Sequence, residues 1–183
     1  MRPTKIVTKL KTNESNKVNL ASPDVNIIID YKNWHNIEPE LASNVKLAVI
    51  KTISVIEIDE DIELSIRLTS DLEMKELNHK YRGKPSPTNV LAFSQEKDSD
   101  LLFKYNRRYI GDIAIGYESV HKESCEQKKT LSAHLIHLII HGLLHLIGYS
   151  HKNKIDSKVM EGIEIKVLGI LGYKNPYSTE LID

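Results

Sequence analysis

The chain has 183 residues, which suits one domain with a tail better than several domains. Its hydrophobic content of 40% is enough for a buried core, and 25 acidic residues balance 25 basic ones. This balance excludes a strong overall field, so any binding of polyanions must come from local patches. The single cysteine, Cys125, excludes an internal disulfide framework and suits a reducing cytoplasm.

A polar, mostly basic segment occupies residues 1–23. We interpret it as an N-terminal extension with weak structure, and an arm that touches phosphate is the alternative. It has no apolar stretch of the kind found in secretory signals. The folded domain is therefore expected over residues 24–183. Its basic residues are Arg2, Lys5, Lys9, Lys11 and Lys17, and they outnumber the acidic residue Glu14.

The first half of the domain shows two strand patterns and two helix patterns. Residues 62–68 are apolar at every second position, which is typical of a half-buried strand. Pro39 suits the first turn of a helix, and Ser70 or Asp71 suits the N-cap of another. In chain order we expect a strand over 25–30, a helix over 38–56, a strand over 62–68 and a helix from Ser70 or Asp71 to about His79.

The second half begins with a loop rich in Gly, Pro and Ser. Strands and helices remain intermixed, so we expect a small α+β layer structure with a histidine-bearing helix against one sheet. In chain order the elements are a loop over 81–89, a strand over 90–93, a charged hairpin connection over 95–108, a strand over 109–115, and helices over 118–127, 131–148 and 156–171.

The helix over 131–148 carries the most specific chemistry. Its histidines at 134, 137, 141 and 145 are spaced by three, four and four residues, so they share one helix face. Gly148 can end the helix and turn the chain back, which brings His151 toward His141 and His145. Three neutral imidazoles at one point are what a catalytic Zn²⁺ needs, with a fourth position open for water.

A single histidine on an apolar face is more often a core residue with satisfied hydrogen bonds. Two histidines at an i, i+4 spacing favour a ligand pair, and a third beyond a glycine turn makes a metal site the stronger interpretation. We expect His134 and His137, which lie upstream, to be core residues or to support the ligands. Residues 131–149 are also apolar enough to raise the question of a membrane span. The histidines and the flanking lysines favour a buried central helix instead.

The three histidines follow the metallopeptidase pattern H-E-x-x-H-x-x-G-x-x-H with one departure. Gly142 stands where that pattern has the glutamate that serves as general base. A glycine cannot accept a proton from water. The sequence therefore argues against ordinary proteolysis and for a metal hydrolase with different acid–base chemistry.

Two further segments carry candidate functional residues. Arg82 and Lys84 are expected in a rigid loop with Thr88 and Asn89, where an arginine can hold phosphate oxygens through two hydrogen bonds. A solvated loop arginine is the alternative. Asp112 is expected to begin a strand and to orient an imidazole or a loop, although an exposed aspartate at a strand start is commoner.

Basic residues are frequent in the segments that flank the histidines. If half of them lined one cleft, its potential would favour a nucleic-acid backbone, and an ordinary solvated surface is the alternative. The chain has no RRM, KH or zinc-knuckle pattern. The basic residues are Lys80, Arg82, Lys84, Arg107, Arg108, Lys122, Lys128, Lys129, Lys152 and Lys154.

Several ordered motifs resemble those of the YbeY-type bacterial endoribonucleases, which are zinc hydrolases of rRNA maturation. The resemblance covers roughly residues 25–177 and leaves residues 1–23 outside it. Its carriers are LNHKYRGKPSPTNVLAF at 77–93, GDIAIG at 111–116, HGLLHLIGYSH at 141–151, Met160-Glu161, and LGYKNPY at 171–177.

This resemblance implies a single small α+β domain, with a mixed sheet of about four strands, about five helices and a metal cleft at the histidine helix. It also implies that His141, His145 and His151 hold one Zn²⁺ and that Arg82 acts on RNA. Two positions depart from the family's usual aspartates, Asn89 and Ser150. Ser150 weakens carboxylate support beside the last ligand and could alter metal affinity, but neither change removes a ligand.

The leading hypothesis is a zinc-dependent, single-strand-specific endoribonuclease in the cytoplasm. It would mature the 3′ end of small-subunit rRNA, take part in ribosome quality control, and have RNA and the ribosome or its proteins as partners, without a membrane. Arg82 would stabilise charge on the phosphoryl oxygens. Further expected roles are substrate binding by Lys84, Thr88 and Asn89, and support of the ligands by His137, Asp112 and Ser150.

The sequence leaves the nucleophile and the class of function open. Metal-bound hydroxide could act as the general base, or the RNA 2′-OH could be the nucleophile. A zinc metallopeptidase or another metal hydrolase is one alternative function. A ribosome-assembly factor with a structural zinc and no catalysis is another, and four protein ligands would mark such a site.

Overall fold

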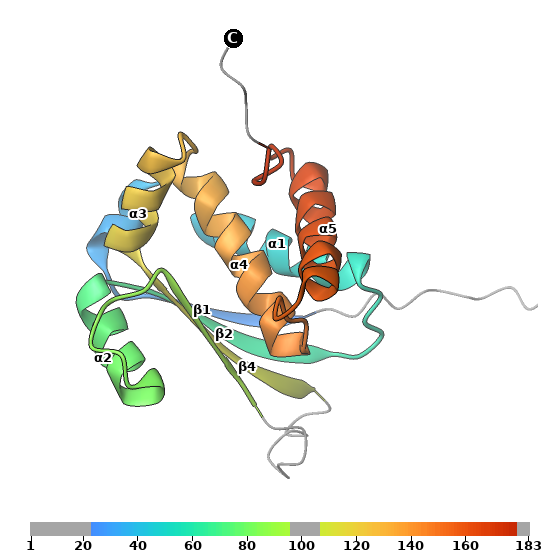
Figure 1. Ribbon diagram of the computed structural model, residues 1–183, viewed down its shortest axis with the longest axis horizontal. Coiled ribbons are helices and arrows are strands. Elements are labelled where there is room, and N and C mark those ends of the chain that lie inside the picture. Colours follow the sequence, from blue (N-terminus) through green and yellow to red (C-terminus); the bar gives the residue numbers. More distant parts are fainter. Residues whose placement is uncertain (1–22, 96–106, 179–183) are drawn as a thin grey trace, which may run out of the picture.

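The computed structural model describes residues 23–95 and 107–178 (Figure 1). Within these ranges the chain forms a four-stranded sheet, five α helices and one short 3-10 helix. The expected α+β class with a mixed sheet is confirmed. The expected extension at 1–23 and the expected hairpin connection at 95–108 lie almost wholly outside the described residues.

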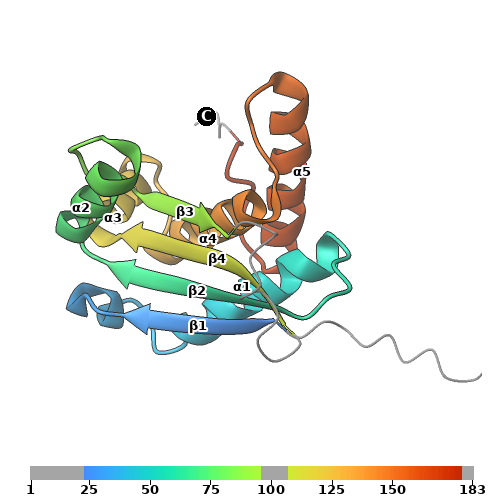
Figure 2. The same ribbon diagram turned by 90° about the horizontal axis from the view of Figure 1, so that it is seen from below.

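The sheet has the strand order β1-β2-β4-β3 (Figure 2). β1 (Asp24–Ile29), β2 (Ile62–Thr69) and β4 (Arg108–Gly116) run parallel to one another. β3 (Val90–Ser94) pairs antiparallel with β4 and forms one edge of the sheet. The alternation of apolar residues in β2 buries one of its faces completely, as the sequence predicts.

The helices divide unequally between the two faces of the sheet (Figure 1). α1 (Leu41–Val55) and α4 (Leu131–Ile147) pack on one face, α5 (Lys154–Ile170) lies on the same side against α1 and α4, and α2 (Asp71–Arg82) lies on the other face. α3 (Tyr117–Glu126) follows β4 directly and packs against α4. The central helix is α4, which contacts α1, α3, α5, β3 and β4.

Burial of α4 follows from these contacts. Ten of its residues are buried, and most belong to one apolar cluster shared with α1, α5 and the sheet. Within the described part of the chain, no single helix is long and apolar enough to cross a membrane. α3 and α4 together meet that test by length and composition, but they are bent by 115° at their junction.

The bounds of two helices and the position of one residue differ from those expected. α1 begins at Leu41, with Glu40 at the N-cap, rather than near residue 38, so Pro39 precedes the helix instead of lying in its first turn. Glu38 is disfavoured in helical conformation because it precedes a proline. α2 continues to Arg82, so this arginine lies in the last helical turn and the loop begins at Gly83. Asp112 lies in the middle of β4 rather than at its start. A 3-10 helix, Lys32–Asn36, was not expected and buries Trp34.

Candidate metal centre

The end of α4 reverses the chain as the sequence predicts. Gly148 has a φ of +108°, in the region that favours glycine, and its N–H donates to the His145 carbonyl oxygen at 3.1 Å. The Tyr149 N–H donates to the Leu144 carbonyl oxygen at 2.9 Å, which completes the helix cap. The chain then turns back so that His151 reaches the last two turns of α4.

This turn brings three imidazoles together. The ring centroids of His141 and His145 are 4.6 Å apart, and His151 lies 5.4 Å from the first ring and 5.0 Å from the second. One nitrogen from each ring lies within 4.8 Å of the other two. The Nε2 atoms of His141 and His145 are 3.1 Å apart. We call these three residues the imidazole cluster.

A buried carboxylate on α5 holds the first ring of the cluster. Glu164 has no exposed surface, and its Oε1 lies 2.9 Å from His141 Nδ1. Its Oε2 lies 3.0 Å from His137 Nε2 and accepts a hydrogen bond from the Tyr177 hydroxyl. Burial alone would raise the pKa of Glu164, but hydrogen bonds from His137, His141 and Tyr177 outweigh it and lower the pKa to about 2. Glu164 is therefore an ionised acceptor.

The other two rings are held differently. His145 Nδ1 lies 3.0 Å from the Tyr149 carbonyl oxygen, which fixes its Nε2 toward His141. Burial, and next the neighbouring His141, lower the pKa of His145, and this favours the neutral imidazole that binds a metal. His151 is exposed, and within the described residues neither of its ring nitrogens has a hydrogen-bond partner. It is the least constrained member of the cluster.

The donor set fits a zinc ion. For ligands at 2.0–2.1 Å in tetrahedral geometry, neighbouring ligand atoms are about 3.3 Å apart. The 3.1 Å between the two Nε2 atoms is close to this separation. The Nδ1 atoms of His141 and His145 both face acceptors, a carboxylate and a carbonyl, as metal-bound histidines usually require. Three ligands also leave one position for a substrate or water.

The imidazole cluster opens into a cleft of about 520 Å³. Thr88 and Asn89 line this cleft together with the side of β3, and Arg82 reaches it from the end of α2. Three of the residues expected to act on substrate are therefore beside the cluster. Lys84 is exposed and is not among the residues that line the cleft.

The glycine within the histidine motif has a packing role. A Cβ atom at Gly142 would lie 3.2 Å and 3.3 Å from two carbons of Ile113 on β4. The absence of a side chain thus lets α4 approach the sheet, and a glutamate at this position would press against Ile113. Within the described lining of the cleft there is no carboxylate that takes the place of the missing base.

Asn89 is tied to the helices behind the cleft. Its Nδ2 donates to Glu123 Oε2 at 3.0 Å, and the same oxygen lies 2.7 Å from His134 Nε2. Its Oδ1 accepts from the Val90 N–H at 2.7 Å. His134 is buried against α3, as expected for a core histidine, and burial lowers its pKa. His137 instead shares Glu164 with His141.

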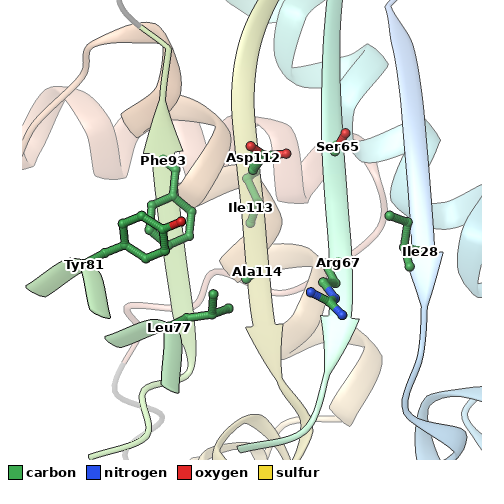
Figure 3. Close-up of a pocket in the computed structure, with 9 residues that line it drawn as sticks. All are labelled: Ile28, Ser65, Arg67, Leu77, Tyr81, Phe93, Asp112, Ile113 and Ala114. Carbon is green, nitrogen blue, oxygen red and sulfur yellow. The ribbon is translucent and has the colours of Figure 1, made fainter. Parts of the chain in front are cut away.

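Other expected site residues lie elsewhere. Asp112 is on the opposite face of the sheet, beside Ser65 and Phe93 in a hollow that α2 partly covers, so it does not reach an imidazole (Figure 3). Its carboxylate accepts from the Tyr109 hydroxyl at 2.5 Å. Ser150 donates to Asp156 at 3.4 Å rather than contacting a ligand ring. Of the ten flanking basic residues, only Arg82 is among the described residues that line the cleft.

Sequence patterns did not identify Glu164 or Tyr177. A signal for Glu164 was present, because it falls on the buried stripe of α5 with Met160, Val167 and Leu168, where an acid needs partners. Its partners come from α4, and sequence spacing alone does not join two helices. Tyr177 lies within the LGYKNPY segment, but its contact with Glu164 depends on the path of the chain after α5.

Comparison with known proteins places this arrangement in a family. A sequence model described as endoribonuclease YbeY matches residues 28–172. The chain belongs to the endoribonuclease YbeY family. Endoribonuclease YbeY of Bradyrhizobium diazoefficiens is 36% identical over 172 residues, which cover 92% of this chain and 91% of that protein.

Further relatives agree with this assignment. Endoribonuclease YbeY of Acinetobacter baylyi is 37% identical over 146 residues, covering 78% of this chain and 92% of that protein. The solution structure of a Thermotoga maritima protein matches with a TM-score of 0.55 and 25% identity, covering 87% of this chain and 99% of that one. The resemblance inferred from the motifs is therefore confirmed, and so is the fold.

Proposed function

We propose that this YbeY-family protein is a zinc-dependent endoribonuclease that cuts single-stranded rRNA in the cytoplasm, at the small-subunit 3′ end, and that it works with the ribosome in maturation and quality control. The observation that carries the proposal is the imidazole cluster of His141, His145 and His151 beside Arg82 in one cleft. The family's name, endoribonuclease YbeY, supports RNA as the substrate.

The residues of the cleft would divide the work. A zinc ion held by the imidazole cluster supplies Lewis acidity for phosphoryl transfer. Glu164 keeps the His141 ring oriented and its Nε2 directed to the cluster. Arg82, on the last turn of α2, supplies a guanidinium that can hold two phosphoryl oxygens as their charge increases. Thr88 offers a hydroxyl to the RNA, whereas the Asn89 amide, already bonded to Glu123 and to the Val90 N–H, has one N–H left to offer. The side of β3 limits the path of the RNA.

A peptidase function has less support. The metallopeptidase pattern places its base at the position of Gly142, where even a Cβ would lie 3.2 Å from the Ile113 side chain, so a glutamate there requires Ile113 to shift. A purely structural zinc is also disfavoured, because such sites usually have four protein ligands and the cluster has three. Both observations favour an open hydrolytic site.

The proposal is tested by cleavage of a single-stranded RNA with the zinc-loaded protein, the metal-free protein and two variants. His145→Ala should remove metal binding and cleavage together. Arg82→Ala should keep the metal and lower kcat by roughly 10²–10³-fold. Arg107→Ala is a matched control, since Arg107 pairs with Asp24 away from the cleft. Full cleavage by the metal-free protein, or by His145→Ala, would refute the proposal.

The same assay separates the two possible nucleophiles. A 2′-deoxy nucleotide at the cut position blocks cleavage only if the 2′-OH attacks. A 5′-phosphate on the product indicates attack by water. If the zinc-loaded protein binds RNA and never cuts it, the assembly-factor alternative replaces the proposed activity.

A further inference from the structure

A second hollow lies beside the first turns of α4. It has a volume of about 320 Å³, and three lysines, Lys128, Lys129 and Lys174, are among its lining residues. His137 and Tyr173 complete the wall toward α4 and α5. None of the described residues that line it is acidic. We call this cavity the lysine hollow.

The charges around the lysine hollow suit an anion. Lys129 Nζ donates to the Gln127 side-chain oxygen at 2.8 Å and to the Pro176 carbonyl oxygen at 2.9 Å. An ammonium has three N–H donors, so one is left for a ligand oxygen. α4 begins at Leu131 with no acid in its first turn. Because the start of a helix is itself positive, lysines beside it add to a local positive potential that attracts an anion.

The lysine hollow is aligned with the imidazole cluster along one face of α4. His137 lines the hollow, and His141 and His145 follow on the same face one and two turns later. From His137 to His145 the helix rises about 12 Å. The Tyr177 ring lies 5.5 Å from the His137 ring and also lines a small cleft with His141, His151, Glu161 and Glu164. The exposed tyrosine therefore stands between the two sites. Glu164 is fully buried and held by its hydrogen bonds, so Glu161 is the carboxylate that an RNA strand passes there.

The hollow on the other face of the sheet has the opposite character (Figure 3). It contains Asp112, and its one arginine, Arg67, is paired with Asp30 at 2.5 Å and with Glu73 at 2.7 Å. The two carboxylates neutralise the charge of Arg67, so this arginine attracts a polyanion only weakly. The sheet also separates that hollow from the imidazole cluster. The path of an RNA strand is therefore better continued along α4.

We propose that the lysine hollow is a phosphate subsite, which holds a phosphodiester of the same RNA strand that is cut at the imidazole cluster. The inference rests on the proposed function and adds to it the direction of the RNA strand. The RNA would run along the histidine face of α4 and across Tyr177. The lysines supply affinity without base specificity, because phosphate contacts position a strand but do not read its sequence.

The test compares two lysine variants on the zinc-loaded protein. Lys128→Gln with Lys174→Gln removes two charges from the hollow and leaves Lys129, which holds the Pro176 segment, in place. Lys122→Gln is the matched control, because Lys122 is on α3, exposed, and pairs only with Glu126 among the described residues. Circular dichroism and Tm establish that each variant is folded, and a Lys→Arg pair restores the charge if folding is altered.

The subsite predicts a several-fold rise in KM for the double variant, with kcat unchanged. The slope of log KM against log salt should fall by about 0.7 for each phosphate that the variant no longer neutralises. The rise should vanish when the RNA is shortened by single nucleotides until it no longer spans both sites. A double variant that matches Lys122→Gln on a long RNA would overturn the subsite while leaving the proposed cleavage intact.

Binding distinguishes the two proposals if cleavage itself fails. When the wild-type protein cuts no RNA, the anisotropy of a fluorescent single-stranded RNA decamer is measured with metal-free protein. A weaker affinity of the double variant than of Lys122→Gln then supports the subsite although the proposed function has failed. Equal affinities overturn the subsite as well.

Discussion

At the scale of single residues, Glu164 has the most partners in the site. Its two carboxylate oxygens contact His137, His141 and the Tyr177 hydroxyl, and the side chain is completely buried. An unpaired buried carboxylate would be strongly destabilising, so these contacts are a condition of folding as well as of ligand orientation. Burial and the Glu164 carboxylate in turn raise the pKa of the Tyr177 hydroxyl, so it remains a donor.

Glu164→Gln should weaken zinc binding by roughly 10–100-fold, because an amide presents an N–H₂ group to partners that are themselves donors. Competition with a chromogenic chelator measures the affinity. Glu161→Gln is the control, because it makes the same change on the same helix. In the described structure Glu161 has no hydrogen bond to an imidazole. Equal affinities in the two variants would show that Glu164 does not orient a ligand.

His134 should make the metal-free protein sensitive to acid. Burial lowers its pKa, so the unfolded chain takes up a proton near pH 6.5 while the folded chain resists it to lower pH. The contribution of His134 to stability is therefore constant above pH 6.5 and falls as pH drops from 6.5 toward its folded pKa. Glu123 opposes this shift, and Lys129 and His137 strengthen it.

His134→Gln removes that protonation and should destabilise less at pH 5 than at pH 7.5. Urea unfolding of the two proteins at both pH values measures the difference. The other histidines titrate in both proteins and cancel in the comparison. If His134→Gln destabilised the protein more at pH 5 than at pH 7.5, the lowered pKa of His134 would not be the cause of the acid sensitivity.

At the scale of elements, the turn that ends α4 decides whether a metal site forms. Gly148 has a φ of +108°, and nothing lies within 4 Å of the position of a Cβ. An alanine there is strained by backbone conformation alone, not by contact. This strain would fall on residues 148–150, which join α4 to His151 and position its ring.

Gly148→Ala should lower the free energy of unfolding by roughly 1–2 kcal/mol and weaken zinc binding. Gly162→Ala on α5 is the control. Its Cβ also meets nothing within 4 Å, but the backbone is helical, so it should stabilise by about 0.5–1 kcal/mol. Chemical denaturation of both variants provides the measurement. A Gly148→Ala protein as stable as wild type, with unchanged zinc affinity, would separate the turn from the site.

Local sequence patterns predicted most of the helices and strands and the grouping of the imidazole cluster. The N-caps Ser70 and Thr130 accept from backbone N–H groups as such residues do, and the alternation in β2 and the histidine spacing in α4 follow from strand and helix geometry. The end of α2 was missed because helical residues continue past His79 until Gly83 adopts a φ of +68°. The residues between His79 and Gly83 include no glycine or proline that would end the helix earlier.

At the scale of the whole molecule, the sheet separates two surfaces of different chemistry. α4 and its histidines lie on one face, and Asp112, Ser65 and Arg67 line the hollow on the other. The antiparallel edge strand β3 lies at the border, with Ala92 toward the cleft and Phe93 toward the hollow. Period-2 alternation thus assigns adjacent residues of one strand to different sites.

Sequence patterns could not have predicted this division. Which face Asp112 takes depends on its pairing with Ser65 on β2 and Phe93 on β3, and β3 comes before β4 in sequence but lies outside it in the sheet. The contact of Glu164 with His141 likewise joins residues 23 positions apart on two helices. These are tertiary pairings, which periodicity does not encode.

The coordination shell of the zinc-loaded protein tests the central claim most directly. X-ray absorption at the zinc edge should give three imidazole nitrogens at about 2.0–2.1 Å and one oxygen from an exchangeable water, and His151→Ala should remove one imidazole. Four protein ligands, or a spectrum that His151→Ala leaves unchanged, would contradict an open site built by the turn at Gly148.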